Sequence, residues 1–372
     1  MKIVVAMDSF KGTLSAADAC KITTKAIKSV LPSATIIEKP LADGGEGTIE
    51  TILSTCRGRY ITHKVMGPLS DMQVDADFGW LEKERIAVVE MAKASGMTLL
   101  SEEELNPLLT TTFGTGQLIK AAMEMKPKKL LLAVGGSATV DGGVGAAMAL
   151  GWKFLDSNGN SVGLGGSYLK EITRIIKPEE LDICDIDVLC DVTNPLIGPN
   201  GAAYVYAPQK GADSLAVELL ENSMRNLCEV VKKDLSTDIN IPGAGAAGGL
   251  AAGAHAFMAA KLVSGIDEVM ELIELPKSVQ QCDCVITGEG CFDSQSLDGK
   301  VISGITKVAG RFEKKVYVIA GKVNLGKDRY YEHGIEEAVA ISDGVDTDYT
   351  MQNAEILLEK SAIELARTHL AS

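Results

Sequence analysis

The chain has 372 residues, with 36 lysines and arginines against 50 aspartates and glutamates, which gives a formal net charge of −14. Its hydrophobic fraction of 46% and charged fraction of 23% are typical of a globular protein and argue against intrinsic disorder. The acidic balance argues against duplex nucleic acid as a partner, because such binding needs a basic face. At about 100–200 residues per domain, the length favours two domains.

The spacing of cysteines and histidines narrows the class of protein further. Eight cysteines are scattered without a CxxC pair and four histidines form no HxxxH pattern, so we expect neither a disulfide framework nor a zinc site. Residues 239–260 carry no formal charge, but their glycines and alanines and Pro242 argue against a membrane span. The start of the chain is too poor in apolar residues for a signal peptide, so we expect a cytoplasmic protein.

The N-terminal part of the chain is predicted to contain two strand–loop–helix units. Residues 3–7 form an apolar strand, and Ser15 can cap a helix that ends before Pro32. Residues 34–37 form a second strand, followed by a glycine-rich loop and a helix through residues 49–53.

The C-terminal hundred residues repeat this alternation, which is typical of a parallel sheet. The middle of the chain has its own strands, each with a loop rich in glycine or aspartate after it. The sequence therefore predicts two α/β domains: a discontinuous parallel-sheet domain of Rossmann or flavodoxin type, residues 1–62 plus 268–372, and an inserted α/β domain, residues 63–267. The remaining predicted strands are residues 130–134, 186–190, 282–286, 315–320 and 338–341, and the remaining predicted helices are residues 301–309 and 354–368.

Five predicted strands lead into loops that combine glycine with acidic or hydroxyl side chains. Ligands of open parallel sheets bind at the carboxyl ends of the strands, where helix N-termini and exposed amides favour anions. The loop at residues 135–143 has two glycine pairs and two hydroxyls, which can form a phosphate cradle or a tight helix entry onto a sheet. It is not a Walker P-loop, because the chain has no GxxxxGK[ST] motif.

Residues 243–248 match the GxGxxG pattern, and Asp267 lies about 20 residues further on, as a dinucleotide site would require. Pro242 and the poor strand character of residues 238–242 argue against that reading. Close helix packing or a contribution to a phosphate pocket is the favoured interpretation, with nicotinamide dinucleotide binding as the alternative.

Acidic side chains follow the predicted strands and suit phosphoryl transfer. Mg²⁺ prefers oxygen ligands, and a transferred phosphoryl group needs a carboxylate near the attacking hydroxyl. A carboxylate substrate needs a cation, for which Lys11 is the first candidate, ahead of Lys210 and Lys300. The candidate carboxylates are Asp8, Asp43, Glu46, Asp191, Glu289 and Asp293.

Taken together, these motifs resemble those of the bacterial glycerate kinases, of the glycerate 2-kinase type, from residue 1 to about residue 322. The resemblance implies transfer of the ATP γ-phosphoryl group to D-glycerate with Mg²⁺, in two α/β domains with the active site in the cleft between them. It favours 2-phosphoglycerate as the product, with 3-phosphoglycerate as the alternative. The matching segments are residues 8–16, 40–48, 135–143, 190–196, 243–249 and 287–290, followed by Asp293 and residues 295–296.

Our hypothesis for the mechanism gives each candidate residue a role. Ser9 and Lys11 would bind the substrate carboxylate, with Asp8 and Asp43 beside them, and Lys11 would also take part in catalysis. Asp43 or Asp191 would accept the hydroxyl proton, and Asp191, Glu289 and Asp293 would place Mg²⁺. The ATP phosphates would bind to Gly135, Gly136, Ser137, Thr139, Gly142, Gly288 and Gly290.

Two rival functions come from other classes. One is a nicotinamide-dependent oxidoreductase that binds pyrophosphate with the segment Gly243–Gly248, and the other is a non-catalytic binding protein. The expected partners of the kinase are D-glycerate and ATP, without nucleic acid or membrane, and a homo-oligomer is left open.

Overall fold

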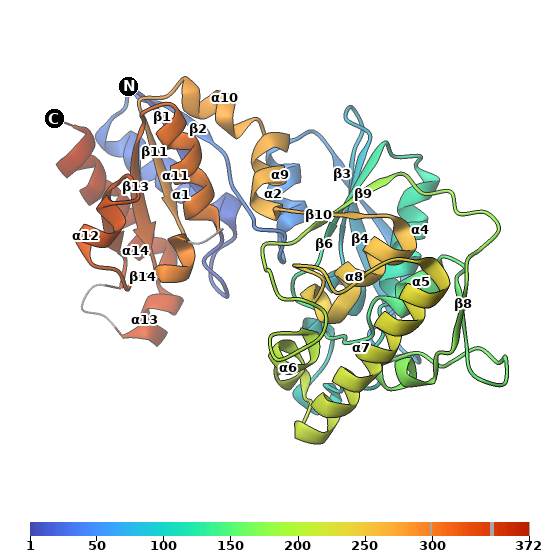
Figure 1. Ribbon diagram of the computed structural model, residues 1–372. Helices are drawn as coiled ribbons and strands as arrows, with labels where there is room; N and C mark the ends of the chain where they lie inside the picture. Colours follow the sequence, from blue (N-terminus) through green and yellow to red (C-terminus); the bar gives the residue numbers. More distant parts are fainter. Residues whose placement is uncertain (298–299, 343–345, 372) are drawn as a thin grey trace. The chain divides into compact units, whose positions relative to one another are not determined.

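In a computed structural model of the chain, the structure describes residues 1–297, 300–342 and 346–371. Contacts within the chain divide it into two compact units (Figure 1). Unit 1 comprises residues 1–43, 50–56 and 266–372, and unit 2 comprises residues 44–49 and 57–265. The domain division predicted from the sequence instead places residues 44–49 and 57–62 in the first domain. That this predicted division describes the folding units of the protein stays a prediction.

Unit 1 is built on a five-stranded sheet in the order β15-β13-β11-β1-β2, with every pair parallel. The chain runs from β1 to one edge and then returns to build the other side. This is the doubly wound order of flavodoxin-like folds, whose switch point lies between β1 and β11. The strands are β1 (Lys2–Met7), β2 (Thr35–Glu38), β11 (Cys284–Gly288), β13 (Lys315–Ala320) and β15 (Ile335–Ala340), with a separate pair β12 (Cys291–Phe292) and β14 (Lys322–Val323).

Helices cover both faces of this sheet. Alternate side chains of β1, including Ile3 and Val5, share a buried cluster with Ala19 of α1 and Leu358 of α14. Because strand side chains alternate between faces, the other residues of β1 and β11 face away from that cluster. The helices of unit 1 are α1 (Ala16–Val30), α9 (Gly265–Leu272), α10 (Leu275–Gln280), α11 (Val301–Arg311), α12 (Lys327–Tyr331), α13 (Thr347–Gln352) and α14 (Ala354–Leu365), with a π-turn over Ala366–Leu370.

Unit 2 is built on a six-stranded sheet in the order β10-β9-β6-β5-β4-β3. Its first four strands are parallel, and β4 and β3 continue it as an antiparallel edge that the sequence reading did not anticipate. The strands are β3 (Arg59–Met66), β4 (Gln73–Leu81), β5 (Ile86–Glu90), β6 (Lys129–Ala133), β9 (Asp185–Leu189) and β10 (Lys261–Val263), with a separate hairpin β7 (Lys153–Leu155) and β8 (Arg174–Ile176).

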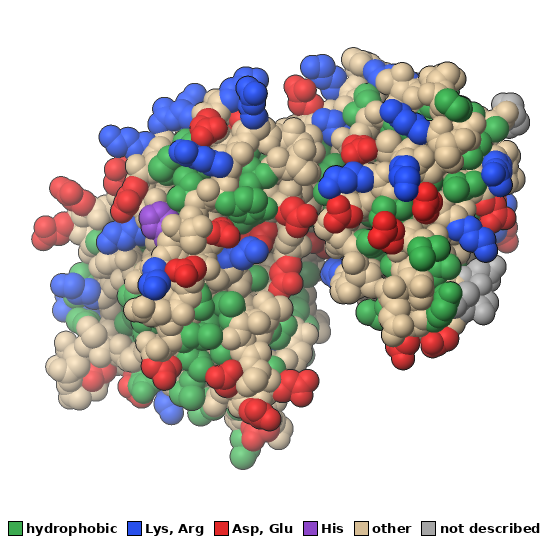
Figure 2. All heavy atoms as spheres, turned by 180° about the vertical axis from the view of Figure 1, so that it is seen from behind, with side chains coloured by type: hydrophobic (Ala, Val, Ile, Leu, Met, Phe, Trp, Pro, Cys, Tyr) green, Lys and Arg blue, Asp and Glu red, His purple; other side chains and the backbone are tan. Residues whose placement is uncertain are grey.

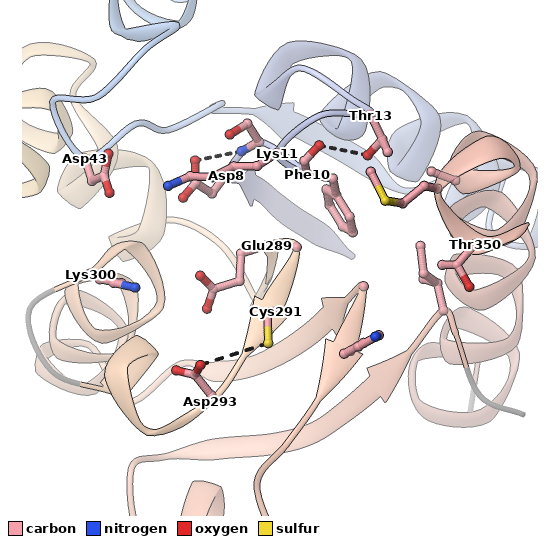
Figure 3. Close-up of a pocket in the computed structure, with 17 residues that line it drawn as sticks. Asp8, Phe10, Lys11, Thr13, Asp43, Glu289, Cys291, Asp293, Lys300 and Thr350 are labelled. Atoms are coloured by element: carbon pink, nitrogen blue, oxygen red, sulfur yellow. Dashed lines mark hydrogen bonds between the residues drawn. The ribbon is translucent and has the colours of Figure 1, made fainter. Parts of the chain in front are cut away.

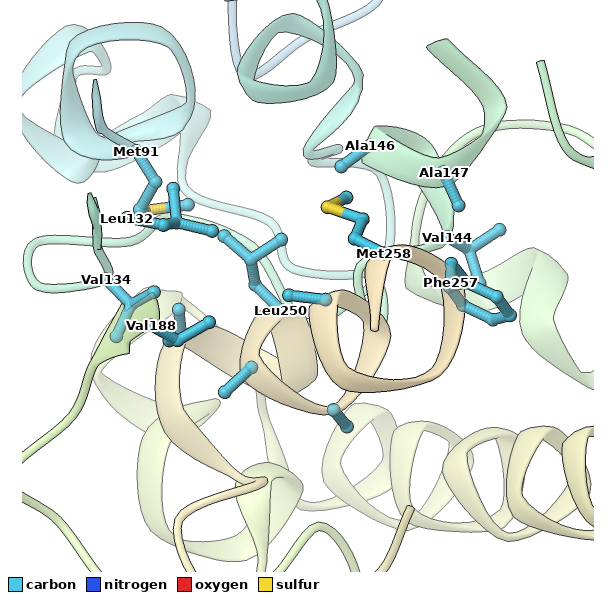
Figure 4. Packing of buried hydrophobic residues seen from close by; sticks show 14 of the residues in the cluster. Met91, Leu132, Val134, Val144, Ala146, Ala147, Val188, Leu250, Phe257 and Met258 are labelled. Atoms are coloured by element: carbon cyan, nitrogen blue, oxygen red, sulfur yellow. The ribbon is translucent and has the colours of Figure 1, made fainter. Parts of the chain in front are cut away.

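The core of unit 2 lies between this sheet and its helices. Figure 4 shows Leu132 and Val188 of the sheet beside Leu250 of α8, with Phe257 further along the same helix. The unit's helices are α3 (Ala92–Ser95), α4 (Phe113–Glu124), α5 (Val144–Ala149), α6 (Ala202–Tyr206), α7 (Ser214–Leu235) and α8 (Ala246–Met258), and α2 (Thr48–Thr55) contains the boundary between the units.

Several predicted elements are confirmed with small changes. Ser15 caps α1 by accepting a hydrogen bond from the Asp18 amide at 3.2 Å. The prediction for β11 was wrong by two residues: the strand runs to Gly288, because Met7 and Gly288 continue the pairing with β1. The loop after it therefore begins at Glu289.

Charged side chains of both signs lie on the surface (Figure 2), and the cysteines form no disulfide bonds among the described residues. On the face shown in Figure 2, lysine and arginine side chains are interspersed with aspartate and glutamate on each unit. All eight cysteines are free thiols. Within the described residues, no helix combines the length and apolar character that crossing a bilayer requires.

Candidate active site

A pocket of about 360 Å³ lies in unit 1 where the strands end. The loops after β1 and β11, the two strands at the switch point, contribute most of its polar residues. Ligands of doubly wound sheets bind at this position. The pocket is lined by Asp8, Ser9, Phe10, Lys11, Thr13, Asp43, Glu289, Gly290, Cys291, Asp293, Lys300, Gly321, Lys322, Ile341, Thr350, Met351 and Ala354 (Figure 3).

Asp8 follows β1 directly, and hydrogen bonds with backbone groups hold it in place. Its amide donates to the Gly288 carbonyl at 2.8 Å, and its carboxylate accepts from the Ser9 amide at 2.6 Å. Burial, with the nearby charges of Asp43 and Glu289, raises the pKa of Asp8 to about 7. The charges of Asp43 and Glu289 therefore oppose the ionisation of Asp8.

Glu289 is the most enclosed carboxylate of the pocket, with 8% of its surface exposed. Figure 3 shows its carboxylate directed into the pocket, with Asp8 and Lys300 nearby. Its Oε1 atom has no hydrogen-bond partner. Burial raises the pKa of Glu289, while a Ser296 hydrogen bond and the Lys300 charge oppose that rise. A buried carboxylate oxygen without a donor fits a site that takes a cation.

Asp293 comes four residues after Glu289 and directly follows the short strand β12. Its Oδ1 atom accepts from the Gln295 amide at 2.9 Å, which closes a turn into a short 3₁₀ segment. Among the described residues, no three acidic, cysteine or histidine side chains are grouped so as to hold a metal ion by themselves. Mg²⁺ is commonly held by one or two carboxylates together with substrate phosphates, and Glu289 and Asp293 suit that arrangement.

Three lysines also line this pocket: Lys11, Lys300 and Lys322. Lys11 is exposed on the loop after β1, next to Ser9, and the amine of Lys300 donates to Gln295 Oε1 at 3.4 Å. The pocket thus offers cations for an anionic group as well as carboxylates for a metal ion. Of the substrate and metal residues expected from the sequence, the structure brings together Asp8, Ser9, Lys11, Asp43, Glu289 and Asp293.

The remaining predicted residues lie in unit 2, apart from the glycines at positions 288 and 290. Asp191 follows β9, and its Oδ1 atom accepts from the Gly265 amide at 3.0 Å. The loop over residues 135–143 follows β6 and leads into α5. These features lie at the carboxyl ends of the strands of the unit 2 sheet.

The loop over residues 135–143 is held by a buried carboxylate. Asp141, 1% exposed, accepts from the Thr112 amide at 2.8 Å and from the Gly143 amide at 3.1 Å, besides the Thr112 hydroxyl. Burial raises the pKa of Asp141, and these hydrogen bonds oppose the rise. Asp141 therefore shapes the loop from inside.

The first glycines of this loop pack against the segment that follows β2. A side chain on Gly135 would lie 2.6 Å from Gly45, and one on Gly136, whose φ is +71°, would meet the Glu46 carboxylate. These two glycines allow two loops of unit 2 to approach closely.

Two charged residues matter more in the structure than the sequence indicated. Glu90 ends β5 and is buried, and its carboxylate accepts from the Ile49 amide at 2.7 Å. Burial raises the pKa of Glu90. Lys210 is 1% exposed and donates to residues of the loop that follows β6. The charge at the end of an apolar run could have indicated Glu90, but no sequence pattern shows the burial of Lys210.

Gly288 and Gly142 are closely surrounded by neighbouring atoms, and their predicted role in nucleotide binding stays a prediction. Gly288 is the last residue of β11, and a side chain there would lie 1.9 Å from the Ile319 carbonyl. A side chain on Gly142 would lie 2.4 Å from Leu227. Both glycines are needed for packing, whereas Gly290 has no neighbour closer than 3.6 Å to such a side chain.

The GxGxxG segment is also a packing element. A side chain on Gly248 would lie 1.9 Å from the Thr139 carbonyl, and the Gly248 carbonyl accepts from the Gly142 amide at 3.0 Å. Residues 236–241 form no strand, and φ is positive at residues 247–249. The geometry favours close packing against the loop after β6 over a dinucleotide-binding turn.

Comparisons with known proteins agree with this architecture. The model of the Glycerate kinase family matches residues 3–370, further along the chain than the motifs noted above. A glycerate kinase of Halalkalibacterium halodurans is 41% identical, with 98% of this chain and 97% of the relative covered. A glycerate 2-kinase of Escherichia coli K12 is 42% identical, with 93% and 92% covered.

A solved structure is also similar to this chain along nearly its whole length. The crystal structure of a candidate glycerate kinase 2 from Salmonella typhimurium LT2 superposes with a TM-score of 0.88 at 37% identity, covering 99% of this chain and 98% of that one. The expected mixed α/β fold with parallel sheets is confirmed, and so is the resemblance noted from the motifs. The chain belongs to the glycerate kinase family.

Proposed function

We propose that this protein transfers the γ-phosphoryl group of ATP to the 2-hydroxyl of D-glycerate, giving 2-phosphoglycerate and ADP, with Mg²⁺ as the required cation. The observation that carries the proposal is the match along nearly the whole chain to relatives named glycerate kinase and glycerate 2-kinase. The pocket of unit 1, with carboxylates and lysines at a sheet switch point, supports it.

For the acceptor, we propose that Lys11 and Ser9 bind the carboxylate of D-glycerate, with Asp8 and Asp43 orienting its hydroxyls. Their placement in one pocket of unit 1 supports this assignment. Asp43 or Asp191 takes the proton of the attacking hydroxyl as its oxygen bonds to the γ-phosphorus. The bond from that phosphorus to the bridging oxygen breaks, and ADP leaves with the electron pair.

For the nucleotide, we propose that Gly135, Gly136, Ser137 and Thr139 hold the phosphates, with Gly290 on the unit 1 side. Gly142 and Gly288 support this by permitting close packing. Asp191, Glu289 and Asp293 are the proposed Mg²⁺ residues, and the unpartnered Glu289 Oε1 supports a cation there. Mg²⁺, when bound, neutralises phosphate charge. The cleft between two domains, the cytoplasmic location and any homo-oligomer stay predictions.

The test is an assay that couples ADP release to a chromogenic reaction. The purified protein should release ADP with MgATP and D-glycerate. Lactate, which lacks the 3-hydroxyl, and 3-hydroxypropionate, which lacks the 2-hydroxyl, serve as matched acceptors. If no ADP forms with D-glycerate although the protein is folded and binds ATP, the kinase proposal is wrong and a binding protein is the better account.

Nuclear magnetic resonance of the product identifies the phosphorylated oxygen. Coupling of phosphorus to the C2 proton is expected, and coupling to the C3 protons would instead assign 3-phosphoglycerate. Quenching of NADH fluorescence by the protein would favour the oxidoreductase alternative at residues 243–248.

A further inference from the structure

Lys210 is a fully enclosed lysine in unit 2. It ends a 3₁₀ turn over Pro208–Lys210, and Gly211 follows with a φ of +93°. A side chain on Gly211 would lie 2.3 Å from the Leu105 carbonyl, so the chain after the lysine is pressed against a neighbouring segment. Lys210 itself is 1% exposed. Burying an ammonium group is costly unless it is hydrogen-bonded and has a task that needs it.

The side-chain amine of Lys210 donates hydrogen bonds to the loop after β6. Its Nζ atom donates to Ser137 Oγ at 2.6 Å and to the Thr139 carbonyl at 2.7 Å. Hydrogen bonds from an ammonium group are roughly twice as strong as neutral ones. Lys210 therefore fixes both ends of residues 137–139 from the inner side of the loop. Because Ser137 Oγ accepts from the lysine, its own proton points elsewhere.

No carboxylate of the described residues forms an ion pair with Lys210. The charged group that acts on it is Asp141, which does so through space. The Asp141 carboxylate already accepts hydrogen bonds from Thr112 and Gly143. Burial lowers the pKa of Lys210 to about 7, and the charge of Asp141 opposes that shift. The ammonium group of Lys210 thus has no carboxylate of the described residues paired with it, and it lies at a loop that is proposed to bind a triphosphate.

We propose that Lys210 is a positioning residue for the nucleotide: it holds Ser137 and Thr139 in place from behind, and its charge raises the affinity of the loop over residues 135–143 for phosphate. This inference rests on the proposed function. Because binding and protonation are reciprocally linked, a bound triphosphate favours the charged lysine. Nucleotide binding at about pH 8, where the free protein holds Lys210 largely neutral, should therefore take up a proton.

The test is calorimetric titration of the full chain with a non-hydrolysable ATP analogue and Mg²⁺ at about pH 8, in two buffers of different ionisation enthalpy. The wild type should take up a fraction of a proton that Lys210→Met does not. We expect Lys210→Met to bind the analogue at least about tenfold more weakly, since it loses two hydrogen bonds from a charged donor. In turnover, KM for ATP should rise while KM for D-glycerate stays unchanged.

Lys129→Met is the matched control. Lys129 begins β6, at the opposite end of the strand from the loop, and forms an ion pair with Asp187. Its loss should lower the melting temperature without changing nucleotide affinity or proton uptake. Ser137→Ala keeps the buried lysine and removes one of its hydrogen-bond acceptors. It should weaken binding of the analogue by a smaller factor than Lys210→Met does and keep the proton uptake. If Lys210→Met does not fold, the wild type alone tests the inference: proton uptake on analogue binding is expected at about pH 8, and its absence would overturn the role of Lys210.

The outcomes separate the inference from the proposed function. If the wild type turns over D-glycerate while folded Lys210→Met shows wild-type affinity and wild-type proton uptake, the role of Lys210 is wrong and the kinase stands. If the wild type neither binds the analogue nor releases ADP with D-glycerate, both are overturned.

Discussion

At the level of single residues, the pocket of unit 1 gathers three carboxylates, Asp8, Asp43 and Glu289, and buries Asp8 beside the other two. Burial is the main cause that makes ionisation of Asp8 harder, and the charges of Asp43 and Glu289 add to it. The positions of all three after strands were visible in the sequence. Their mutual electrostatics were not, because they come from loops far apart in the chain and meet only when β1 pairs with both β11 and β2.

Asp8→Asn should change stability in a pH-dependent way. The pKa of Asp8 is raised from 3.8 to about 7 on folding, so between these values the folded state binds more protons and stability falls as pH rises. Above pH 7 the penalty is complete, at most about 4 kcal/mol. Without divalent cations, Asp8→Asn should melt higher than the wild type at about pH 8, and the difference should vanish near pH 4.

Asp18→Asn is the control for that experiment, because the pKa of Asp18 shifts in the opposite direction to that of Asp8. Asp18 is exposed and hydrogen-bonded to Lys21, which lowers its pKa. Its replacement should cost a little stability at neutral pH and nothing in acid. Parallel melting curves for the wild type and Asp8→Asn across this pH range would contradict the raised pKa of Asp8.

Asp191→Asn tests the proton acceptor. The amide oxygen of asparagine can still accept the Gly265 hydrogen bond, so the fold should be preserved while the basic group is lost. If Asp191 is the base, kcat should fall by at least about a hundredfold with little change in melting temperature. Near wild-type turnover would remove Asp191 from that role and leave Asp43, whose asparagine variant serves as the parallel measurement.

At the level of elements, local signals were predicted well and long-range pairing was not. Ser15 and the apolar spacing after it determine α1, and residues 315–320 are the strand β13 as expected. The end of β11 was missed, because Gly288 belongs to the strand only through its pairing with Met7. The antiparallel edge of unit 2 was missed for a similar reason, since much of β3 is polar and exposed.

Two neighbouring glycines test this difference between strand and loop. Gly288→Ala places a methyl group 1.9 Å from the Ile319 carbonyl, whereas Gly290→Ala meets nothing closer than 3.6 Å. Gly288→Ala should therefore destabilise unit 1 by about 3 kcal/mol or more, measured by urea unfolding. Gly290→Ala should unfold like the wild type and, if Gly290 approaches phosphate, raise KM for ATP. Equal stability of the two variants would contradict the described end of β11.

At the level of the whole molecule, both sheets carry their candidate residues at the carboxyl ends of parallel strands. Alternation of strands and helices in the sequence predicts such edges but not the order of the strands. The order β15-β13-β11-β1-β2 explains why loops from residues 8–13 and 289–293 share one pocket. The burial of Lys210 and Glu90 belongs to this level too, since their partners lie in distant segments.

The boundary between the units can be tested with fragments, because residues 44–49 lie with unit 2 in the structure but precede its sheet in the chain. The Ile49 amide donates to the buried Glu90 carboxylate, and the Gly135 amide donates to the Gly44 carbonyl. A fragment of residues 63–267 lacks these contacts and the first residues of β3 (Arg59–Met66), whereas a fragment of residues 44–265 keeps them.

The longer fragment should unfold cooperatively and be more stable by at least about 1–3 kcal/mol, the cost of leaving a buried polar group such as Glu90 unsatisfied. Urea unfolding followed by circular dichroism measures the difference. A fragment of residues 57–265, which keeps all of β3 but lacks residues 44–56, should fall between the two and separates the contribution of β3 from that of residues 44–56. If the fragment of residues 63–267 is as stable as the longer one, residues 44–62 belong to the first domain, and the contacts at Glu90 contribute nothing to the folding of the inserted one.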